Sequence, residues 1–86
     1  MSLAVKVSGA MGKHADYRRR VGSRIRQLRQ ERGLSQTALA RLMPTGTVAQ
    51  VSRWERGKTL PSVASLGALA KALDVTEERI MGGDSD

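Results

Sequence analysis

The chain has 86 residues and no cysteine, and its 15 Lys and Arg against 8 Asp and Glu give a formal net charge of +7. This length suits one domain, and the lack of cysteine excludes both a disulfide framework and a thiolate metal site. The single histidine, His14, has no cluster of carboxylates or histidines beside it, so we expect neither a metal nor another cofactor.

The positive charge is unevenly distributed along the chain. It lies in residues 1–61, whereas residues 62–86 carry more Asp and Glu than Lys and Arg. A basic surface suits a polyanion, because each neutralised phosphate releases condensed counterions. A membrane surface would attract the same charge, and a solvated basic face needs no partner at all. No apolar run reaches the ~18 residues of a spanning helix, and no cleavable leader is recognised, so we expect a cytoplasmic protein without membrane contact.

The N-terminal part is predicted to be an arm followed by a helix. Residues 1–15 alternate apolar and polar residues only briefly and are interrupted by Gly9 and Gly12. We expect a flexible arm, which either has no function or lies in a DNA groove. From about Asp16, apolar residues recur three and four apart, which predicts a helix that ends at Gly33. The apolar positions of this helix are Val21, Ile25 and Leu28.

Two short helices around a proline-containing turn are predicted next. Ser35 is a suitable N-cap for the first of them, which must end at Met43 because Pro44 disfavours a helical residue before it. Its candidate core residues are Leu39, Leu42 and Met43. Thr47 can cap the second, over residues 48–56, and Gly57 ends it.

The helix over residues 48–56 has two different faces. At 100° per residue, Val51 and Trp54 share one side, and small residues beside Arg53 occupy the other. Small residues with one guanidinium suit close approach to another surface. An ordinary solvent-exposed face would show a similar pattern.

Two further helices complete the predicted domain over residues 16–82. Ser62 caps a helix that runs to Leu73, and Thr76 caps a short one that ends before Gly82. The apolar stripe of the longer helix is expected in the core and consists of Val63, Leu66, Leu69, Ala70 and Leu73. An acidic tail follows at residues 83–86.

Three sequence blocks occur in a fixed order: LSQ at 34–36, VSRWERGK at 51–58 and PS at 61–62. With the Leu and Ala residues around them, these blocks resemble the Xre and phage-repressor (Cro-like) class of helix-turn-helix regulators over residues 21–82. The resemblance implies a compact all-α, five-helix domain of the lambda-repressor type, in which the second and third helices form the helix-turn-helix. The turn at residues 43–46 is one residue longer than is usual in that family.

The resemblance also implies roles for individual residues on DNA. The residues that would contact bases are Val48, Ala49, Gln50 and Arg53. The residues that would contact phosphates are Gln36, Thr47, Ser52 and Lys58, the last assisted by backbone amides around Gly57. Arg29 and Glu55 would form a structural ion pair. Arg18, Arg19 and Arg20 would add only non-specific attraction.

These observations predict a sequence-specific regulator of transcription, a repressor, that acts at the nucleoid. It would bind a palindromic operator in double-stranded DNA as a homodimer, with Ile80 and Met81 of the last helix as the contact between copies. The alternative is an antitoxin-like or coactivator-like adaptor that uses the same fold to bind a protein. An enzyme is not expected, because the chain has no Cys and no paired carboxylates around an obvious pocket.

Overall fold

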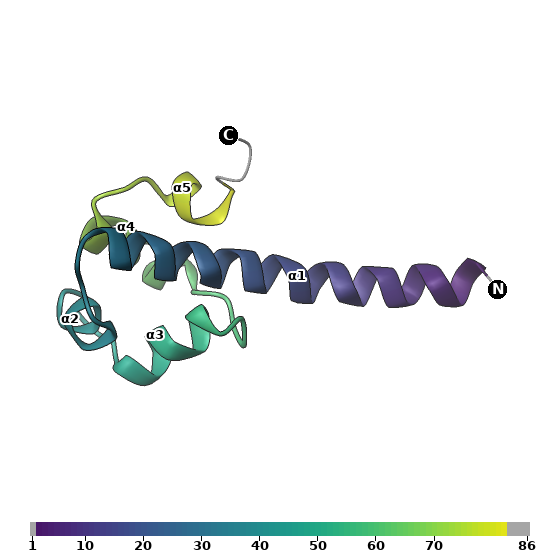
Figure 1. The fold of residues 1–86 in the computed structure, drawn as a ribbon, viewed down its shortest axis with the longest axis horizontal. Coiled ribbons are helices and arrows are strands. Elements are labelled where there is room, and N and C mark those ends of the chain that lie inside the picture. The colour runs from purple at the N-terminus through teal and green to yellow at the C-terminus, as the bar shows by residue number, and fades with distance from the viewer. Residues whose placement is uncertain (1, 83–86) are drawn as a thin grey trace.

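A computed structural model describes residues 2–82 and places the side chains of residues 14–82. Five helices follow one another (Figure 1): α1 (Ser2–Glu31), α2 (Gln36–Arg41), α3 (Val48–Glu55), α4 (Val63–Leu73) and α5 (Glu77–Met81). No strand occurs in residues 2–82, so the predicted all-α, five-helix fold is confirmed. The predicted acidic tail lies outside the described residues.

Each of the four short helices begins after a residue whose side chain caps it. The hydroxyl oxygens of Ser35, Thr47, Ser62 and Thr76 each accept a hydrogen bond from the backbone N–H three residues later. Each bond satisfies a donor that has no partner within its own helix. The four predicted helix starts are therefore confirmed.

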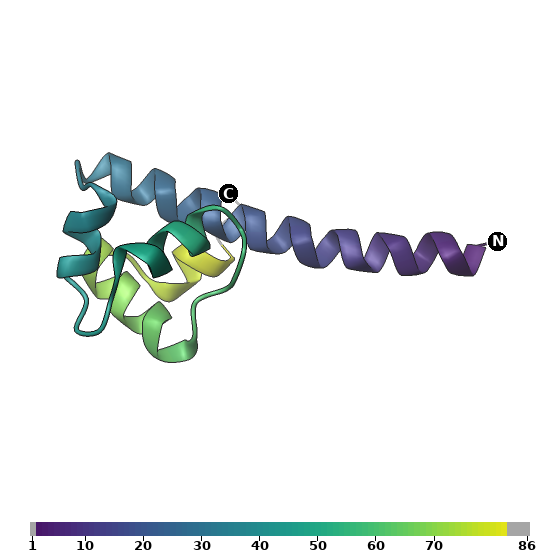
Figure 2. The same ribbon diagram turned by 90° about the horizontal axis from the view of Figure 1, so that it is seen from below.

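Figure 2 shows α2 to α5 gathered beside the C-terminal part of α1. All five helices contribute to one hydrophobic core. Its buried members are Val21, Ile25, Leu28, Leu39, Ala40, Met43, Val51, Trp54, Leu69, Ala70, Leu73 and Ile80. Most of the predicted core residues are among them. Three of the predicted ones are not: Leu66 is half-buried and packs against the core, and Leu42 and Val63 are exposed.

Leu42 and Val63 are exposed, with 55% and 88% of their surface accessible, and their assignment to the core is wrong. Leu39 and Met43 are four residues apart, so they lie on the same side of the α2 segment, which faces the core. Leu42 lies at the edge of that side. Val63 lies in the first turn of α4, which is exposed from residue 62 to residue 64. The buried stripe of α4 therefore begins about one turn later than predicted.

The first helix is much longer than predicted. It begins at Ser2, and its N-terminal half continues in a straight line beyond the body of the domain (Figures 1 and 2). The predicted start at Asp16 is therefore wrong. Gly9 and Gly12 lower helix propensity by about 1 kcal/mol each but keep their backbone N–H groups, so they do not force a break. A role of residues 1–15 in a DNA groove stays a prediction.

Candidate nucleic-acid interface

The helix-turn-helix formed by α2 and α3 occupies one side of the domain. In Figure 1, α3 lies on the opposite side of α1 from α5, at the outer edge of the body. The turn between α2 and α3 keeps Met43 in the core and leaves Pro44 and Thr45 on the surface. Of these three residues, the turn therefore adds only Met43 to the core.

The two faces of α3 differ as the sequence indicates. Val51 and Trp54 are buried against the core. On the other side, Val48, Ala49 and Arg53 are exposed. Gln50 and Ser52 are half-buried at the flanks. Three of the four predicted base-contact residues thus lie on the outward side of α3, where Ala49 and Arg53 are one turn apart, and the fourth, Gln50, lies at its edge.

Thr47 is the N-cap residue of α3. Its Oγ1 accepts the Gln50 N–H at 3.2 Å, and the hydroxyl hydrogen is still able to donate. The first turn of a helix also presents backbone N–H groups and the positive end of the helix dipole. This end of α3 has the groups that a phosphate requires, and its contact with DNA stays a prediction.

The expected ion pair between Arg29 of α1 and Glu55 of α3 is present. The guanidinium donates from Nε to Glu55 Oε2 at 2.6 Å and from Nη2 to Glu55 Oε1 at 3.0 Å. A third bond runs from Nη1 to the Leu34 carbonyl oxygen at 2.8 Å. Only 11% of the Arg29 side chain and 4% of the Glu55 side chain are exposed. The pair fixes the C-terminal end of α3 to α1.

The hydrogen bonds and charge of Glu55 raise the pKa of Arg29 above its ordinary value, although burial acts in the opposite direction. Arg29 therefore remains charged at neutral pH. Its charge and that of Glu55 compensate each other inside the domain. Glu55 is also the sole acidic residue of residues 33–61, so the pair neutralises the one carboxylate in the helix-turn-helix segment.

Gln36 belongs to the same hydrogen-bond network, which the sequence did not reveal. Its Nε2 donates to Glu55 Oε1 at 3.0 Å. An amide nitrogen carries two hydrogens, so one remains for a phosphate oxygen. The contact with Glu55 orients the side chain, whereas the predicted phosphate contact is untested.

The turn after α3 corrects one part of the predicted phosphate site. Gly57 adopts a left-handed conformation with φ of 73°. Its N–H donates to the Trp54 carbonyl at 3.0 Å, and the Lys58 N–H donates to the Arg53 carbonyl at 2.9 Å, as in a Schellman motif. These amides are occupied within the helix end and do not face a phosphate. The predicted phosphate contact therefore cannot use these two amides, and the Lys58 side chain remains the donor predicted for it.

The close crossing of α1 over α3 was also not predicted from the sequence. A Cβ atom on Gly22 would lie 2.1 Å from the Trp54 carbonyl oxygen, so only glycine permits this approach. Arg18 donates from Nε to the Gly57 carbonyl at 3.1 Å, across the same crossing. A glycine inside a helical pattern is a signal of close packing, but it does not identify the neighbour.

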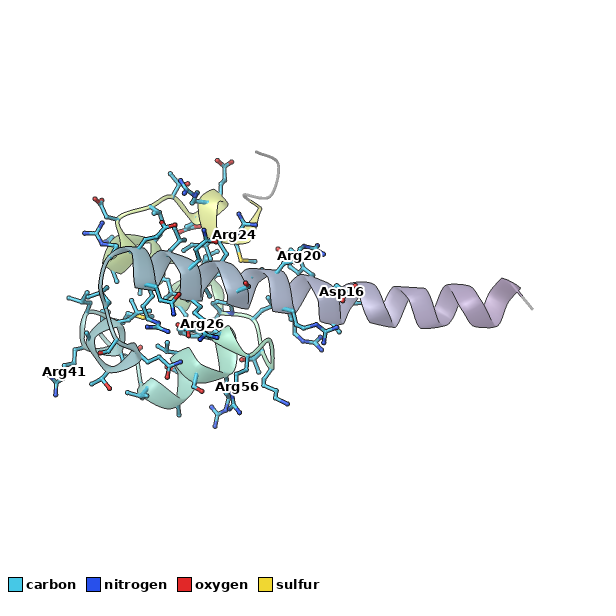
Figure 3. The ribbon with its side chains drawn as sticks, in the orientation of Figure 1. Asp16, Arg20, Arg24, Arg26, Arg41 and Arg56 are labelled. Atoms are coloured by element: carbon cyan, nitrogen blue, oxygen red, sulfur yellow. The ribbon has the colours of Figure 1, made fainter. Side chains whose placement is uncertain are left out.

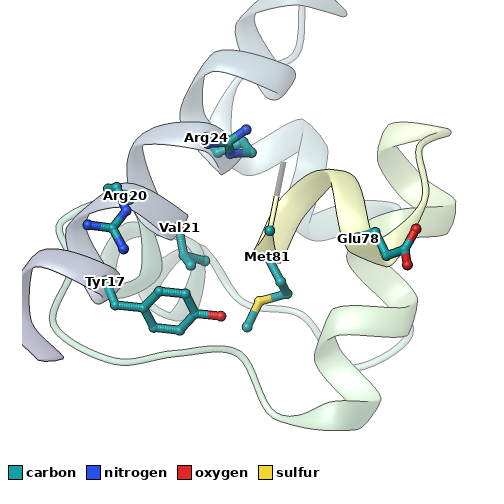
Figure 4. Close-up of a pocket in the computed structure, with 7 residues that line it drawn as sticks. Tyr17, Arg20, Val21, Arg24, Glu78 and Met81 are labelled. Carbon is teal, nitrogen blue, oxygen red and sulfur yellow. The ribbon is translucent and has the colours of Figure 1, made fainter. Parts of the chain in front are cut away.

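The predicted contact between two copies through α5 is wrong for Ile80. Ile80 has no exposed surface and belongs to the core of its own chain. Met81 is half-buried and lines a hollow between α1 and α5 with Tyr17, Arg20 and Arg24 (Figure 4). A domain this small needs the apolar residues of its short last helix for its own core. Ile80 is therefore not left over for a contact with a second copy.

Comparison with known proteins identifies the family of this helix-turn-helix. A family model described as Helix-turn-helix (HTH_3) matches residues 25–80. The chain belongs to the HTH_3 helix-turn-helix family. The match covers the C-terminal part of α1, all of α2, α3 and α4, and most of α5. The N-terminal half of α1 lies outside it.

Two curated relatives of this HTH_3 domain are named as regulators. The chain is 38% identical over 64 residues to repressor protein C2 of Salmonella phage P22, covering 74% of this chain and 29% of that protein. It is 38% identical over 66 residues to the HTH-type transcriptional regulator DicA of Escherichia coli (strain K12), covering 77% of this chain and 48% of that protein. The chain therefore spans less than half the length of either relative.

A solved structure has the same arrangement. The crystal structure of an HTH_3 family transcriptional regulator from Vibrio cholerae matches with a TM-score of 0.73 at 27% sequence identity, over 83% of this chain and 39% of that chain.

Within residues 2–82, no helix is long and apolar enough to cross a membrane.

Proposed function

We propose that this HTH_3 protein binds double-stranded DNA sequence-specifically and represses transcription in the cytoplasm, at the nucleoid. The single observation that supports this most strongly is the outward face of α3. Small side chains there surround Arg53, which forms no ion pair with any side chain in residues 14–82. An unpaired guanidinium on a narrow helix face fits the major groove, which admits one α-helix.

The proposed reading of the bases follows from the chemistry of this face. Arg53 donates two hydrogen bonds to O6 and N7 of a guanine, and Gln50 pairs with an adenine edge. Val48 and Ala49 contact a thymine methyl group. Outside the groove, Gln36, Thr47, Ser52 and Lys58 bind phosphates and so fix the position of α3 without reading sequence.

Alanine variants of Arg53 and Lys58 distinguish base reading from phosphate binding. Arg53→Ala is expected to weaken operator binding by about 1–3 kcal/mol and to relax the preference at one base pair. Lys58→Ala is expected to weaken binding to all sequences alike and to reduce the slope of log K against log salt by about 1. Both effects are measured by titrating each variant with operator and random duplexes at several salt concentrations. Equal losses on the two duplexes for both variants would contradict the groove assignment.

We further propose that two copies bind one palindromic operator, because a two-fold protein symmetry matches two half-sites about one helical turn apart. The contact between copies does not include Ile80. In the adaptor alternative, the N-terminal residues and the chain end at Ile80 and Met81 would form the contact with a protein partner. Burial of Ile80 removes part of that contact surface, so DNA binding is the better supported function.

A further inference from the structure

We propose that Arg19 of α1 binds one defined DNA phosphate beside the C-terminal end of α3, together with Lys58. This inference rests on the proposed function and goes beyond it. It also replaces the expectation that Arg18, Arg19 and Arg20 contribute only non-specific attraction. The three arginines are consecutive in the chain, yet the structure gives each a different environment.

The backbone of α1 passes directly over the turn that ends α3. Gly57 is buried, and a Cβ atom on it would lie 2.9 Å from Cγ and 3.1 Å from Cα of Arg19. The side chain of Arg19 therefore starts in contact with the turn that carries Lys58. About 65% of the Arg19 side chain is exposed, so its guanidinium extends from this contact into solvent.

The neighbouring groups make this place suitable for an anion. Lys58 and Arg56 are exposed, and neither forms an ion pair with a side chain that the structure describes. The Gly57 carbonyl, at the negative end of the α3 dipole, accepts the hydrogen bond from Arg18 Nε at 3.1 Å. Arg18 thus occupies a carbonyl group at this end of α3 that would otherwise repel a phosphate, and we assign it a positioning role.

Two backbone donors of this turn are not available to a phosphate, which makes the side-chain donors more important. The backbone N–H groups of Gly57 and Lys58 already donate to carbonyl groups within the end of α3. One flexible lysine is a point charge, whereas a guanidinium presents several donors in a fixed plane that matches phosphate oxygens. Adding Arg19 therefore converts a weak, diffuse contact into a defined one.

Asp16 competes for Arg19 without preventing the contact. Its Oδ1 accepts a bond from Arg19 Nη2 at 3.0 Å, and more than half of both side chains is exposed. An exposed pair of this kind contributes little free energy and is screened by salt. The guanidinium has five N–H donors, so it can turn toward a phosphate at small cost.

Arg20 and Arg24 provide the internal comparison. Both line the hollow between α1 and α5, and the guanidinium carbon of Arg20 lies 5.9 Å from the centre of the Tyr17 ring. Figure 3 shows them on the side of α1 away from α3, whereas Arg56 lies on the α3 side. They carry the same charge as Arg19 but face away from the proposed DNA surface.

The test compares Arg19→Gln with Arg20→Gln on the full chain, using the operator duplex that the wild-type protein selects. Each variant removes one positive charge from adjacent positions. Arg19→Gln is expected to weaken binding about three- to fivefold at low salt and to reduce the salt slope by about 1. Arg20→Gln is expected to change affinity less than twofold, and thermal unfolding should confirm that both variants remain folded.

A neutral methylphosphonate placed at one phosphate after another then locates the contact. For the wild-type protein, one position flanking the α3 half-site should lower affinity, and this loss should disappear in Arg19→Gln but persist in Arg20→Gln. If the two variants lose affinity equally and give the same phosphate pattern as the wild type, the inference is overturned. If the wild-type protein selects and binds no duplex, the proposed function fails instead.

Discussion

Glu55→Ala is expected to lower the free energy of unfolding by about 3–5 kcal/mol, because it leaves the guanidinium of Arg29, which is largely shielded from solvent, without its partner. Only 11% of the Arg29 side chain is exposed, and two of its three hydrogen bonds go to Glu55. Gln36 loses its partner in the same variant. In a domain of this size, each 1 kcal/mol corresponds to about 4–8 °C in Tm, so thermal unfolding measures the effect.

The matched control removes both charges at once. Replacing Arg29 and Glu55 together with methionine leaves no buried ion unpaired, so the double variant should be clearly more stable than Glu55→Ala. A Glu55→Ala protein whose stability is within 1 kcal/mol of the wild type would contradict a buried, structural role for the pair.

The raised pKa of Arg29 also predicts how the stability of the domain depends on pH. Stability from a raised pKa is present below the unfolded-state value and is lost only as the pH rises through the folded-state value, so this contribution should stay constant near neutral pH.

Gly22→Ala is expected to destabilise the domain by about 2–3 kcal/mol, even though alanine is the better helix former by about 1 kcal/mol. The added Cβ would lie 2.1 Å from the Trp54 carbonyl and 2.9 Å from the Glu55 carbonyl, and both are backbone atoms. They can move only if α1 separates from α3. That shift would also strain the Arg29–Glu55 pair and displace the end of α3.

Gly67 in α4 offers the opposite case. A Cβ there meets only Oε2 of Glu77, at 3.4 Å, which is the end of a flexible side chain. Gly67→Ala should therefore raise stability by about 0.5–1 kcal/mol through helix propensity. Denaturant unfolding of both variants measures the pair of effects. If both substitutions raised stability, helix propensity and not the α1–α3 contact would determine the result at Gly22.

Local features of the fold were predictable because their causes are local. A serine or threonine cap is recognised by its own side chain, and Gly33 and Gly57 end helices through their own left-handed backbone. The burial of Val51 and Trp54 follows from helical periodicity alone. The resemblance to a family contributed the Arg29–Glu55 pair, which no local pattern could have revealed.

What the sequence missed depends on contacts between distant segments. The bond from Gln36 to Glu55 and the bond from Arg18 to Gly57 join residues far apart in the chain. Helical periodicity likewise places Val63 and Ile80 on apolar faces. It does not show whether a residue at the end of such a face still reaches the core, or whether the face packs within its own chain or against a second copy. Val63 proved exposed and Ile80 buried, each against expectation. The length of α1 was missed because glycine lowers helix propensity without ending a helix.

The central claim is that α3 reads DNA sequence through its outward face. Selection of bound duplexes from a random library tests it most directly, with the wild-type protein and Arg53→Ala side by side. We predict that the wild type enriches two inverted half-sites about one helical turn apart, and that Arg53→Ala loses the preference at one symmetric pair of positions. Retention of random duplexes without any enriched sequence, or identical sequences for both proteins, would contradict the claim.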